Sequence, residues 1–346
     1  MGYLRENKLW LVPYVPQEAA FGALSVLVPL YVVSDLNQSL IYLGVLEGAW
    51  GASIILGSLL SGYVCDRFAR YRTMVFLSFV GCGFSTLGLM LVHDGLTFLV
   101  LYPVQALFYS AFRPPSNVLV TEWNPAEEWG WVMSVYTSAR AVSWACGLLI
   151  GFFLTPLLQY SGIFALCGAL SLIASPLSLL LLDDPSSFLG RKTASLDRTI
   201  TSAEYVAQLL PLIHSPSLSR YAKTELERIG ETGFGRFLIG ALMFSLATSL
   251  LFTQMPVFLR GVFPNPALVF AVFFTSTIVG AVARPLAGAL NLRGVKTLRA
   301  SCGFRCFLSL LIAPVIALVY PSSLYACFAI FGALGGMYAC LLYTSD

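Results

Sequence analysis

Four charged side chains lie deep inside long apolar runs of this chain. They are the acids Glu18 and Glu47 and the bases Arg113 and Arg140. A charge at the centre of an apolar layer costs about 2.5 to 3.5 kcal/mol on insertion scales, so each needs a partner or an aqueous cavity. A carboxyl in such a place can carry a proton, and a guanidinium can bind an anion. These four are the candidate cavity and coupling residues.

Glu18 and Arg140 lie at matching depths. Glu18 is eight residues into the first apolar run and Arg140 is ten residues into the fifth, counted from the same face. At a rise of about 1.5 Å per residue, both are about 12 to 15 Å deep, so the two side chains are at the right level to pair if their helices are neighbours. The pair either holds the helices together or takes part in binding a substrate or a proton.

Glu47 and Arg113 each leave two alternatives open. Glu47 is flanked by Gly44, Gly48 and Gly51, small residues that permit close helix packing. Its carboxyl is either a proton carrier or a neutral, hydrogen-bonded packing acid. The long side chain of Arg113 either snorkels to the membrane surface or faces a central cavity and binds an anionic substrate.

The composition indicates an integral membrane protein. Hydrophobic residues make up 58% of the chain and charged residues 11%, and the mean hydropathy is +0.80. The apolar runs are about 20 residues long and uninterrupted, which is typical of membrane helices and not of a membrane β-barrel. The fold class is therefore an all-α polytopic membrane protein.

Reading apolar runs between polar breaks predicts ten spans. They lie near 10–33, 41–64, 74–92, 96–120, 130–155, 162–182, 237–259, 267–290, 299–320 and 324 to the end. With a cytoplasmic N-terminus, fifteen of the twenty Lys and Arg residues fall on the cytoplasmic side and only Arg260 outside, the other four being within spans. This bias is typical of a multi-pass protein of the cell membrane in that orientation.

The domain organisation follows from one long hydrophilic segment. We expect an N-terminal bundle of six helices at 1–182, a cytoplasmic linker at 183–236 and an incomplete C-terminal bundle at 237–346. The two halves echo each other, with VPLYVV at 28–33 matching MPVFLR at 255–260 and SLLSG at 58–62 matching RPLAG at 284–288. Such tandem repeats are typical of secondary transporters.

The most specific motif is GYVCDRFARYR at residues 62–72, which we expect to form a short loop between two spans. It contains Gly62, Asp66, Arg67, Arg70 and Arg72. This pattern resembles the loop between helices two and three of the major facilitator superfamily of secondary transporters. The family usually has Gly where this chain has Ala69, so the turn must form without the residue that most easily adopts positive φ.

The resemblance implies a fold of two six-helix bundles and a mechanical role for this motif. In the family, helices one and five are neighbours, which supports the pairing of Glu18 with Arg140. The Asp that ends helix two fastens the halves together on the cytoplasmic side. We therefore expect Asp66 and Glu122 to act in the conformational switch, with the three arginines of the motif facing the acids of the next cytoplasmic loop.

The resemblance also implies two further helices after the tenth. On that ground we expect the second half to be incomplete, with four of six helices. The last seven residues, 340–346, read CLLYTSD and resemble translated adapter sequence, so we interpret them as an artefact of an interrupted gene.

Together these features predict a secondary active transporter of a small solute, working by alternating access and coupled to an ion gradient, with a proton as one candidate ion. One alternative is a sensor or scaffold that shares the fold without transporting. Another is a drug exporter by proton antiport, although Tyr102 stands where exporters have an arginine. We expect no enzyme activity, cofactor or metal, because His, Asp and Cys form no cluster and no phosphate-binding loop is present. A net charge of +3 is too small to suggest a nucleic-acid partner.

Overall fold

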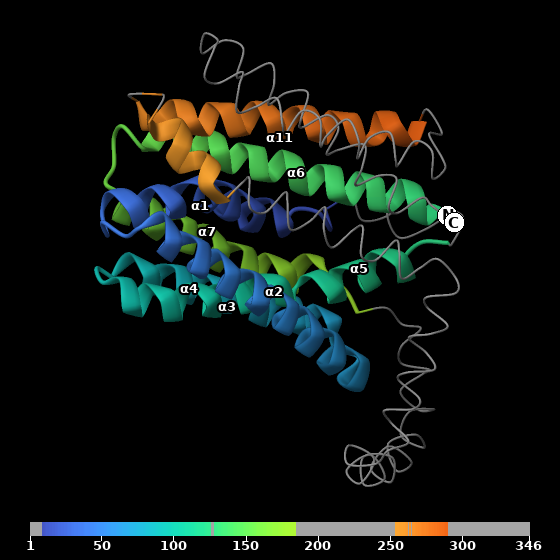
Figure 1. Ribbon diagram of the computed structural model, residues 1–346. Coiled ribbons are helices and arrows are strands. Elements are labelled where there is room, and N and C mark those ends of the chain that lie inside the picture. The colour runs from blue at the N-terminus through green and yellow to red at the C-terminus, as the bar shows by residue number, and fades with distance from the viewer. Residues whose placement is uncertain (1–8, 126–127, 185–252, 262, 264, 290–346) are drawn as a thin grey trace, which may run out of the picture. The chain divides into compact units, whose positions relative to one another are not determined.

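The computed structural model describes residues 9–125, 128–184, 253–261, 263 and 265–289. Within these residues the chain is helical and has no strand (Figure 1). Most of the predicted linker, the first part of the seventh span, the ninth and tenth spans and the segment 340–346 lie outside the described residues.

Eight α-helices have defined bounds. They are α1 (Tyr14–Ser34), α2 (Leu40–Phe68), α3 (Tyr71–Met90), α4 (Gly95–Ala111), α5 (Arg113–Glu122), α6 (Trp129–Leu154), α7 (Tyr160–Leu181) and α11 (Pro266–Ala289). Residues 253–261 are also helical. In the part of the chain that the structure describes, six segments are long and apolar enough to cross a membrane, and α4 and α5 together form one of them. The six predicted N-terminal spans are therefore confirmed, and α11 agrees with the predicted eighth.

The fourth span differs from the prediction because it is two helices rather than one. α4 ends at Ala111 and α5 begins at Arg113, with prolines at the first positions of α5. Pro114 and Pro115 have no N–H to donate to the preceding turn, so the hydrogen-bond ladder is interrupted there. This break places Arg113 at the N-terminal end of a helix in the middle of the chain's fourth crossing.

The connection between α2 and α3 is shorter than the predicted loop. α2 continues to Phe68, so Gly62, Asp66 and Arg67 belong to its last turns, and only Ala69 and Arg70 link the helices. Ala69 ends α2 in the left-handed conformation with φ 50°, and its N–H donates to the carbonyl of Cys65. The turn is thus made by an alanine in a conformation that glycine adopts far more easily.

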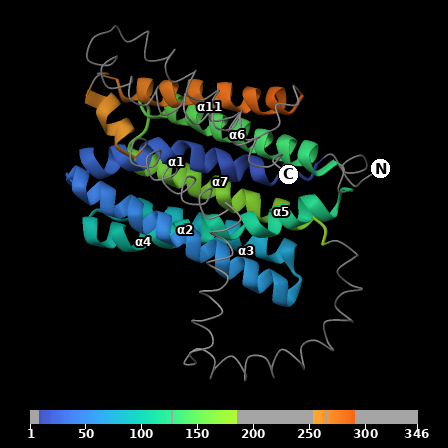
Figure 2. The ribbon, with the colours of Figure 1, turned by 45° about the vertical axis from the view of Figure 1, so that its right-hand side comes forward.

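α1 lies at the centre of the N-terminal bundle, and most of its residues are buried. It packs against α6 and α7, while α3 packs on α7 and α2 on α4 (Figure 2). The crossing of α1 and α6 is very close, because a Cβ added to Gly22 would lie 2.0 Å from the Trp144 carbonyl oxygen, and one on Gly147 would lie 1.9 Å from that of Ala19. Only glycine allows this approach.

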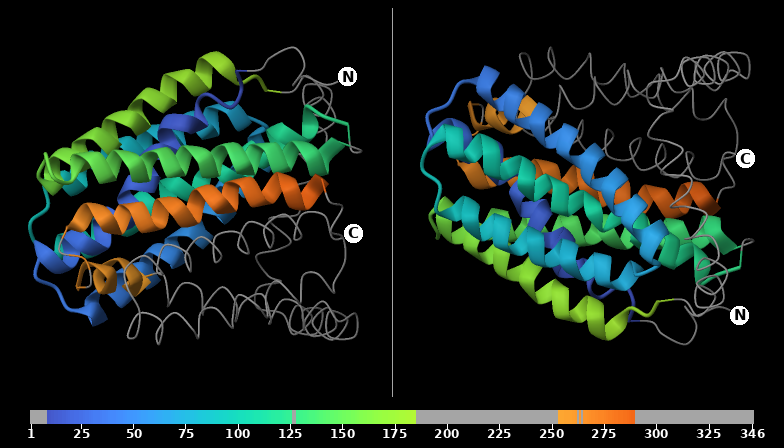
Figure 3. Two further views of the ribbon diagram at one scale, coloured as in Figure 1. Left: turned by 90° about the horizontal axis from the view of Figure 1, so that it is seen from above. Right: turned by 90° about the horizontal axis from the view of Figure 1, so that it is seen from below.

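α11 runs alongside α6 (Figure 3). A Cβ on Gly151 of α6 would lie 2.2 Å from the ring of Phe270 on α11. By contrast, a Cβ on Gly44, Gly48 or Gly51 of α2 would meet no atom of the described chain within 4 Å. The close packing expected around Glu47 from these glycines is therefore not found in the described residues, and the close crossings use glycines of α1 and α6 instead.

Candidate functional site

Arg140 of α6 and Glu18 of α1 form an ion pair inside the bundle. The Nε–H of Arg140 donates to Oε1 of Glu18 at 2.6 Å, and a second guanidinium nitrogen lies 2.5 Å from the same oxygen. The Glu18 side chain is 2% exposed and that of Arg140 is 18% exposed. The pair expected from their matching depths is present, because the glycines of the α1–α6 crossing bring the two helices into contact.

Tyr109 of α4 completes the surroundings of Glu18. Its hydroxyl donates to Oε2, the carboxylate oxygen that Arg140 does not use, at 3.3 Å. The Tyr109 ring stacks on Phe21 with a centroid distance of 3.7 Å, and the guanidinium of Arg113 lies over the ring at 4.7 Å. Both oxygens of Glu18 therefore have donors, and Tyr109 links the ion pair to Arg113.

Arg113 keeps one buried donor without a partner. Its Nε–H has no hydrogen-bond acceptor in the described part of the chain. Among the same residues no acid forms an ion pair with Arg113. A guanidinium that lies on an aromatic ring and still has an N–H to donate can bind an anionic group, since guanidinium and carboxylate match in charge and geometry. Whether Arg113 faces a cavity or snorkels stays a prediction.

A second acid lies on the neighbouring helix pair. The Tyr102 hydroxyl of α4 donates to Oε1 of Glu47 on α2 at 3.3 Å. Trp50, one turn beyond Glu47, lies between Tyr102 and Tyr109 with centroid distances of 6.1 and 6.2 Å. Its buried indole N–H also has no partner among the described residues. Glu47 is thus hydrogen-bonded within a polar, aromatic wall shared by α2 and α4.

Aromatic side chains surround the guanidinium of Arg140. The rings of Phe112 and Tyr136 lie 5.3 and 5.4 Å from it, and Tyr136 in turn contacts the ring of Tyr14 edge to face at 5.4 Å. Cation–π contacts of this kind add to the ion pair and fix the plane of the guanidinium. The site therefore combines two acids and two arginines with rings contributed by α1, α2, α4 and α6.

The predicted switch residues lie at the end of the bundle where α2 meets α3. Arg67 donates to the hydroxyl of Tyr63 within α2 at 3.1 Å. The backbone N–H of Arg72 donates to Asp184 at 2.9 Å, and its guanidinium lies 3.9 Å from Asp183. Arg72 therefore ties the start of α3 to the residues that follow α7. The expected interplay of Asp66, Arg70 and Glu122 stays a prediction.

Sequence reasoning missed the aromatic part of the site. Tyr102 and Tyr109 are seven residues apart on α4, so they share one helix face, and Trp50 follows Glu47 by three residues. These spacings could have predicted that the aromatic rings and Glu47 line a shared surface of α2 and α4. Among the described residues, no group of three His, Cys, Asp or Glu side chains could hold a metal ion. The arrangement suits binding of a charged or polar solute and movement of a proton.

Comparisons with known proteins give a matching family model and a curated relative. A family model described as Major Facilitator Superfamily matches residues 15–345. The probable galactarate/D-glucarate transporter GudP of Escherichia coli is 25% identical over 171 residues, which are 48% of this chain and 38% of that protein. The match thus spans well under half the length of this curated relative.

Solved structures share the fold at low identity. A mutant form of the nucleoside transporter NupG has a TM-score of 0.70 at 11% identity, covering 96% of this chain and 80% of that chain. The xylose transporter XylE from E. coli, in a partially occluded inward-open conformation, has a TM-score of 0.65 at 15% identity, covering 96% and 84%. Tetrameric PepTSo2 has a TM-score of 0.60 at 14% identity, covering 99% and 89%.

Proposed function

The chain belongs to the major facilitator superfamily, and we propose that it is a secondary active transporter that moves a small solute across the cell membrane by alternating access. The observation that carries this proposal is the buried ion pair of Glu18 and Arg140. Together with Glu47 and Arg113, it places four charged residues among the membrane-spanning helices. Ionisable groups inside spans are expensive and mark solute or proton pathways.

The solute we propose is a small organic anion that carries a carboxylate. Arg113 supports this choice, because its guanidinium has no acidic partner in the described residues and a buried donor free for a ligand. The indole N–H of Trp50, which has no partner in the described part of the chain, offers a second donor close to Tyr109. The similarity to a probable galactarate/D-glucarate transporter agrees with a hydroxylated acid as the first candidate.

We propose further that transport is coupled to a proton gradient. Glu18 is bound by Arg140 and Tyr109, and Glu47 only by Tyr102 in the described residues. Glu47 has no cationic partner in the described residues, so its protonation breaks no ion pair. We therefore propose that Glu47 carries the coupled proton. The conformational switch is proposed to involve Gly62, Asp66, the arginines of the α2–α3 region and Glu122, at a cytoplasmic face that also holds the N-terminus.

Uptake into proteoliposomes tests transport against the alternative of a sensor. The gene product, expressed from its full reading frame, is reconstituted and offered labelled D-glucarate, galactarate and simple dicarboxylates, with and without an inward proton gradient. A transporter gives protein-dependent uptake that a protonophore lowers. A sensor or scaffold binds solute without flux, so saturable binding with no uptake in either condition would overturn the proposal.

Orientation has a separate test. The variant His93→Cys, in a protein without its native cysteines, should react with a membrane-impermeant maleimide in intact cells. The variant Arg70→Cys in the same background should react only after the cells are opened. The reverse pattern would overturn the proposed cytoplasmic N-terminus and the placement of the switch.

A further inference from the structure

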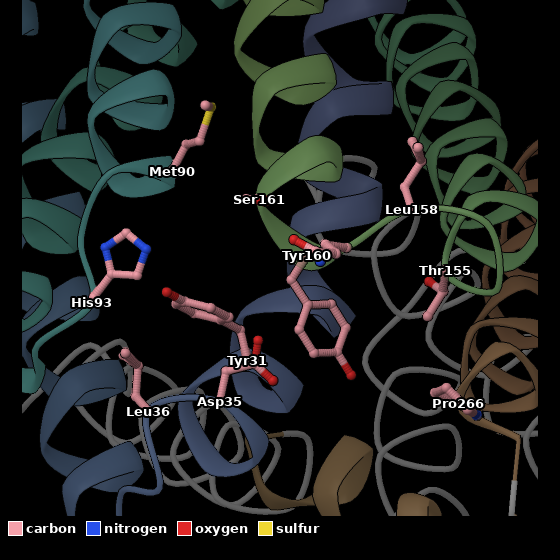
Figure 4. Close-up of a pocket in the computed structure, with 11 residues that line it drawn as sticks. Tyr31, Asp35, Leu36, Met90, His93, Thr155, Leu158, Tyr160, Ser161 and Pro266 are labelled. Atoms are coloured by element: carbon pink, nitrogen blue, oxygen red, sulfur yellow. The ribbon is translucent and has the colours of Figure 1, made fainter.

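A cavity of about 610 Å³ lies at the opposite end of the bundle from the α2–α3 connection. It is bordered by the C-terminal ends of α1 and α3, by the turn between α6 and α7 and by the start of α11 (Figure 4). Its volume is in the range of small-molecule sites, about 300 to 1,000 Å³. None of the four charged residues of the candidate site lines it.

Two tyrosine rings meet at a right angle in the wall of this cavity. The rings of Tyr31 on α1 and Tyr160 on α7 are 6.1 Å apart between centroids with an interplanar angle of 81°. Tyr31 is held in place because its hydroxyl donates to the carbonyl of Val92 at 2.7 Å and its ring packs against Phe164. The corner between the rings is therefore fixed by the fold.

Asp35, an acid that has no ion-pair partner among the described residues, lies beside this corner. Asp35 caps the C-terminal end of α1, where its backbone N–H donates to the Tyr31 carbonyl at 2.9 Å. Its carboxylate forms no ion pair with the described residues. Asp35 acts electrostatically on Tyr31, and both Asp35 and Arg260 act on Tyr160. Partial burial raises the pKa of the Asp35 carboxyl above its usual value.

We propose that this cavity is a binding site for an organic ammonium group, held by the carboxylate of Asp35 and by the faces of Tyr31 and Tyr160. Perpendicular aromatic rings beside an acid are the arrangement by which proteins bind alkylammonium ions, because the ring faces and the carboxylate all present negative potential. The site is separate from the proposed solute site, so it binds a second ligand. Alkylammonium occurs both in soluble amines and in lipid headgroups.

The test uses choline as the probe and its neutral carbon analogue, 3,3-dimethylbutan-1-ol, as the matched control. Binding to the purified protein is followed by saturation-transfer NMR at pH 8. We expect saturable binding of choline and at least about fivefold weaker binding of the neutral analogue, since a cation–π site discriminates by charge. Equal binding of the two compounds, or no saturable binding of choline, would overturn the proposal.

Variants locate the site. Asp35→Asn should weaken choline binding by at least about fivefold and Tyr160→Leu by a similar factor, whereas Tyr160→Phe keeps the ring and should bind as the parent does. Asp94→Asn is the control, because Asp94 is an exposed acid at the same end whose side chain accepts from the Thr97 N–H outside the cavity. Choline binding unchanged in Asp35→Asn, or equally weak in the Phe and Leu variants, would contradict the assignment.

Nanodiscs distinguish the two sources of ammonium. The comparison uses two uncharged lipids, phosphatidylethanolamine and a glucosyl-diacylglycerol that has no amine, so that surface charge does not change the local choline concentration. If a lipid headgroup fills the site, choline binds more weakly in phosphatidylethanolamine discs than in glucosyl-diacylglycerol discs, and Asp35→Asn removes that difference. If the ligand is a soluble amine, the two lipids give equal choline affinity and Asp35→Asn weakens both. A lipid effect that persists in Asp35→Asn would overturn the site as a place for ammonium.

Discussion

Arg140 and Glu18 are 122 residues apart in the chain, and the Nε of Arg140 lies 2.6 Å from a carboxylate oxygen of Glu18. The contact depends on the α1–α6 crossing, where Gly22 and Gly147 let the backbones approach. The glycines therefore let the two helices approach, and this approach brings the opposite charges of Glu18 and Arg140 into contact. The site exists only while that crossing stays tight.

Removing one member of this pair should be strongly destabilising. Arg140→Gln leaves Glu18, which is 2% exposed, buried without its cation, and loss of one partner of a buried pair costs about 3 to 5 kcal/mol. The double variant Glu18→Gln with Arg140→Gln should recover part of that loss, since no buried charge remains. Thermal unfolding in detergent measures both. A single variant as stable as the parent would show that the pair is not buried.

Two glycine-to-alanine variants test the α1–α6 crossing, one inside the crossing and one on α2 as a control. In Gly147→Ala the new Cβ would lie 1.9 Å from the carbonyl oxygen of Ala19, so the helices must separate and the melting temperature should fall. In Gly48→Ala the Cβ meets no atom of the described residues within 4 Å, and replacing a helical glycine should raise stability by about 0.5 to 1 kcal/mol. Similar effects at the two positions would contradict the described packing.

Ala69 predicts a stabilising substitution. Its φ of 50° is left-handed, a conformation that costs a residue with a Cβ about 1 to 2 kcal/mol. Ala69→Gly should therefore raise the unfolding temperature, whereas Ala52→Gly in the exposed middle of α2 should lower it. A decrease for both variants in a thermal-shift measurement would mean that α2 does not end at Ala69 as described.

Asp94 predicts a pH-dependent contribution to stability. The backbone N–H of Thr97 donates to Asp94 at 2.7 Å, and this bond lowers the pKa of the carboxyl below its ordinary 3.8. A depressed folded-state pKa means that the stabilisation is full above the unfolded value and is lost as pH falls through the folded one. Asp94→Ala should thus be less stable than the parent at neutral pH, and the gap should close below pH 3.8. A gap independent of pH would exclude the charged cap.

Much of the fold could be predicted from the sequence because membrane spans obey one simple rule, an apolar run long enough to cross the lipid. The spans from α1 to α7 follow it. The matching depths of Glu18 and Arg140, together with the helix neighbours that the family resemblance implies, predicted their contact. The α4–α5 break was harder, since prolines inside a membrane helix interrupt some helices and only bend others. Pro103 lies within α4, whereas Pro114 and Pro115 follow Arg113 in the first turn of α5.

The rest of the site depends on side-chain packing that no periodicity encodes. Tyr109 is an ordinary aromatic residue in an apolar helix, and its contact with Glu18 follows from how α1 and α4 pack. The glycines near Glu47 and those at the α1–α6 crossing look alike in the sequence, yet only the second set meets a neighbouring helix among the described residues. Small residues allow a close approach but do not choose the partner.

The most direct test of the account is the initial rate of D-glucarate uptake by proteoliposomes that contain the full-length gene product, compared between the parent, Arg113→Lys and Arg113→Gln. If Arg113 binds the carboxylate of the solute, Arg113→Gln should lose at least about tenfold in rate, and Arg113→Lys should keep part of it because the charge remains. Unchanged uptake in a folded Arg113→Gln variant would contradict anion binding at this site.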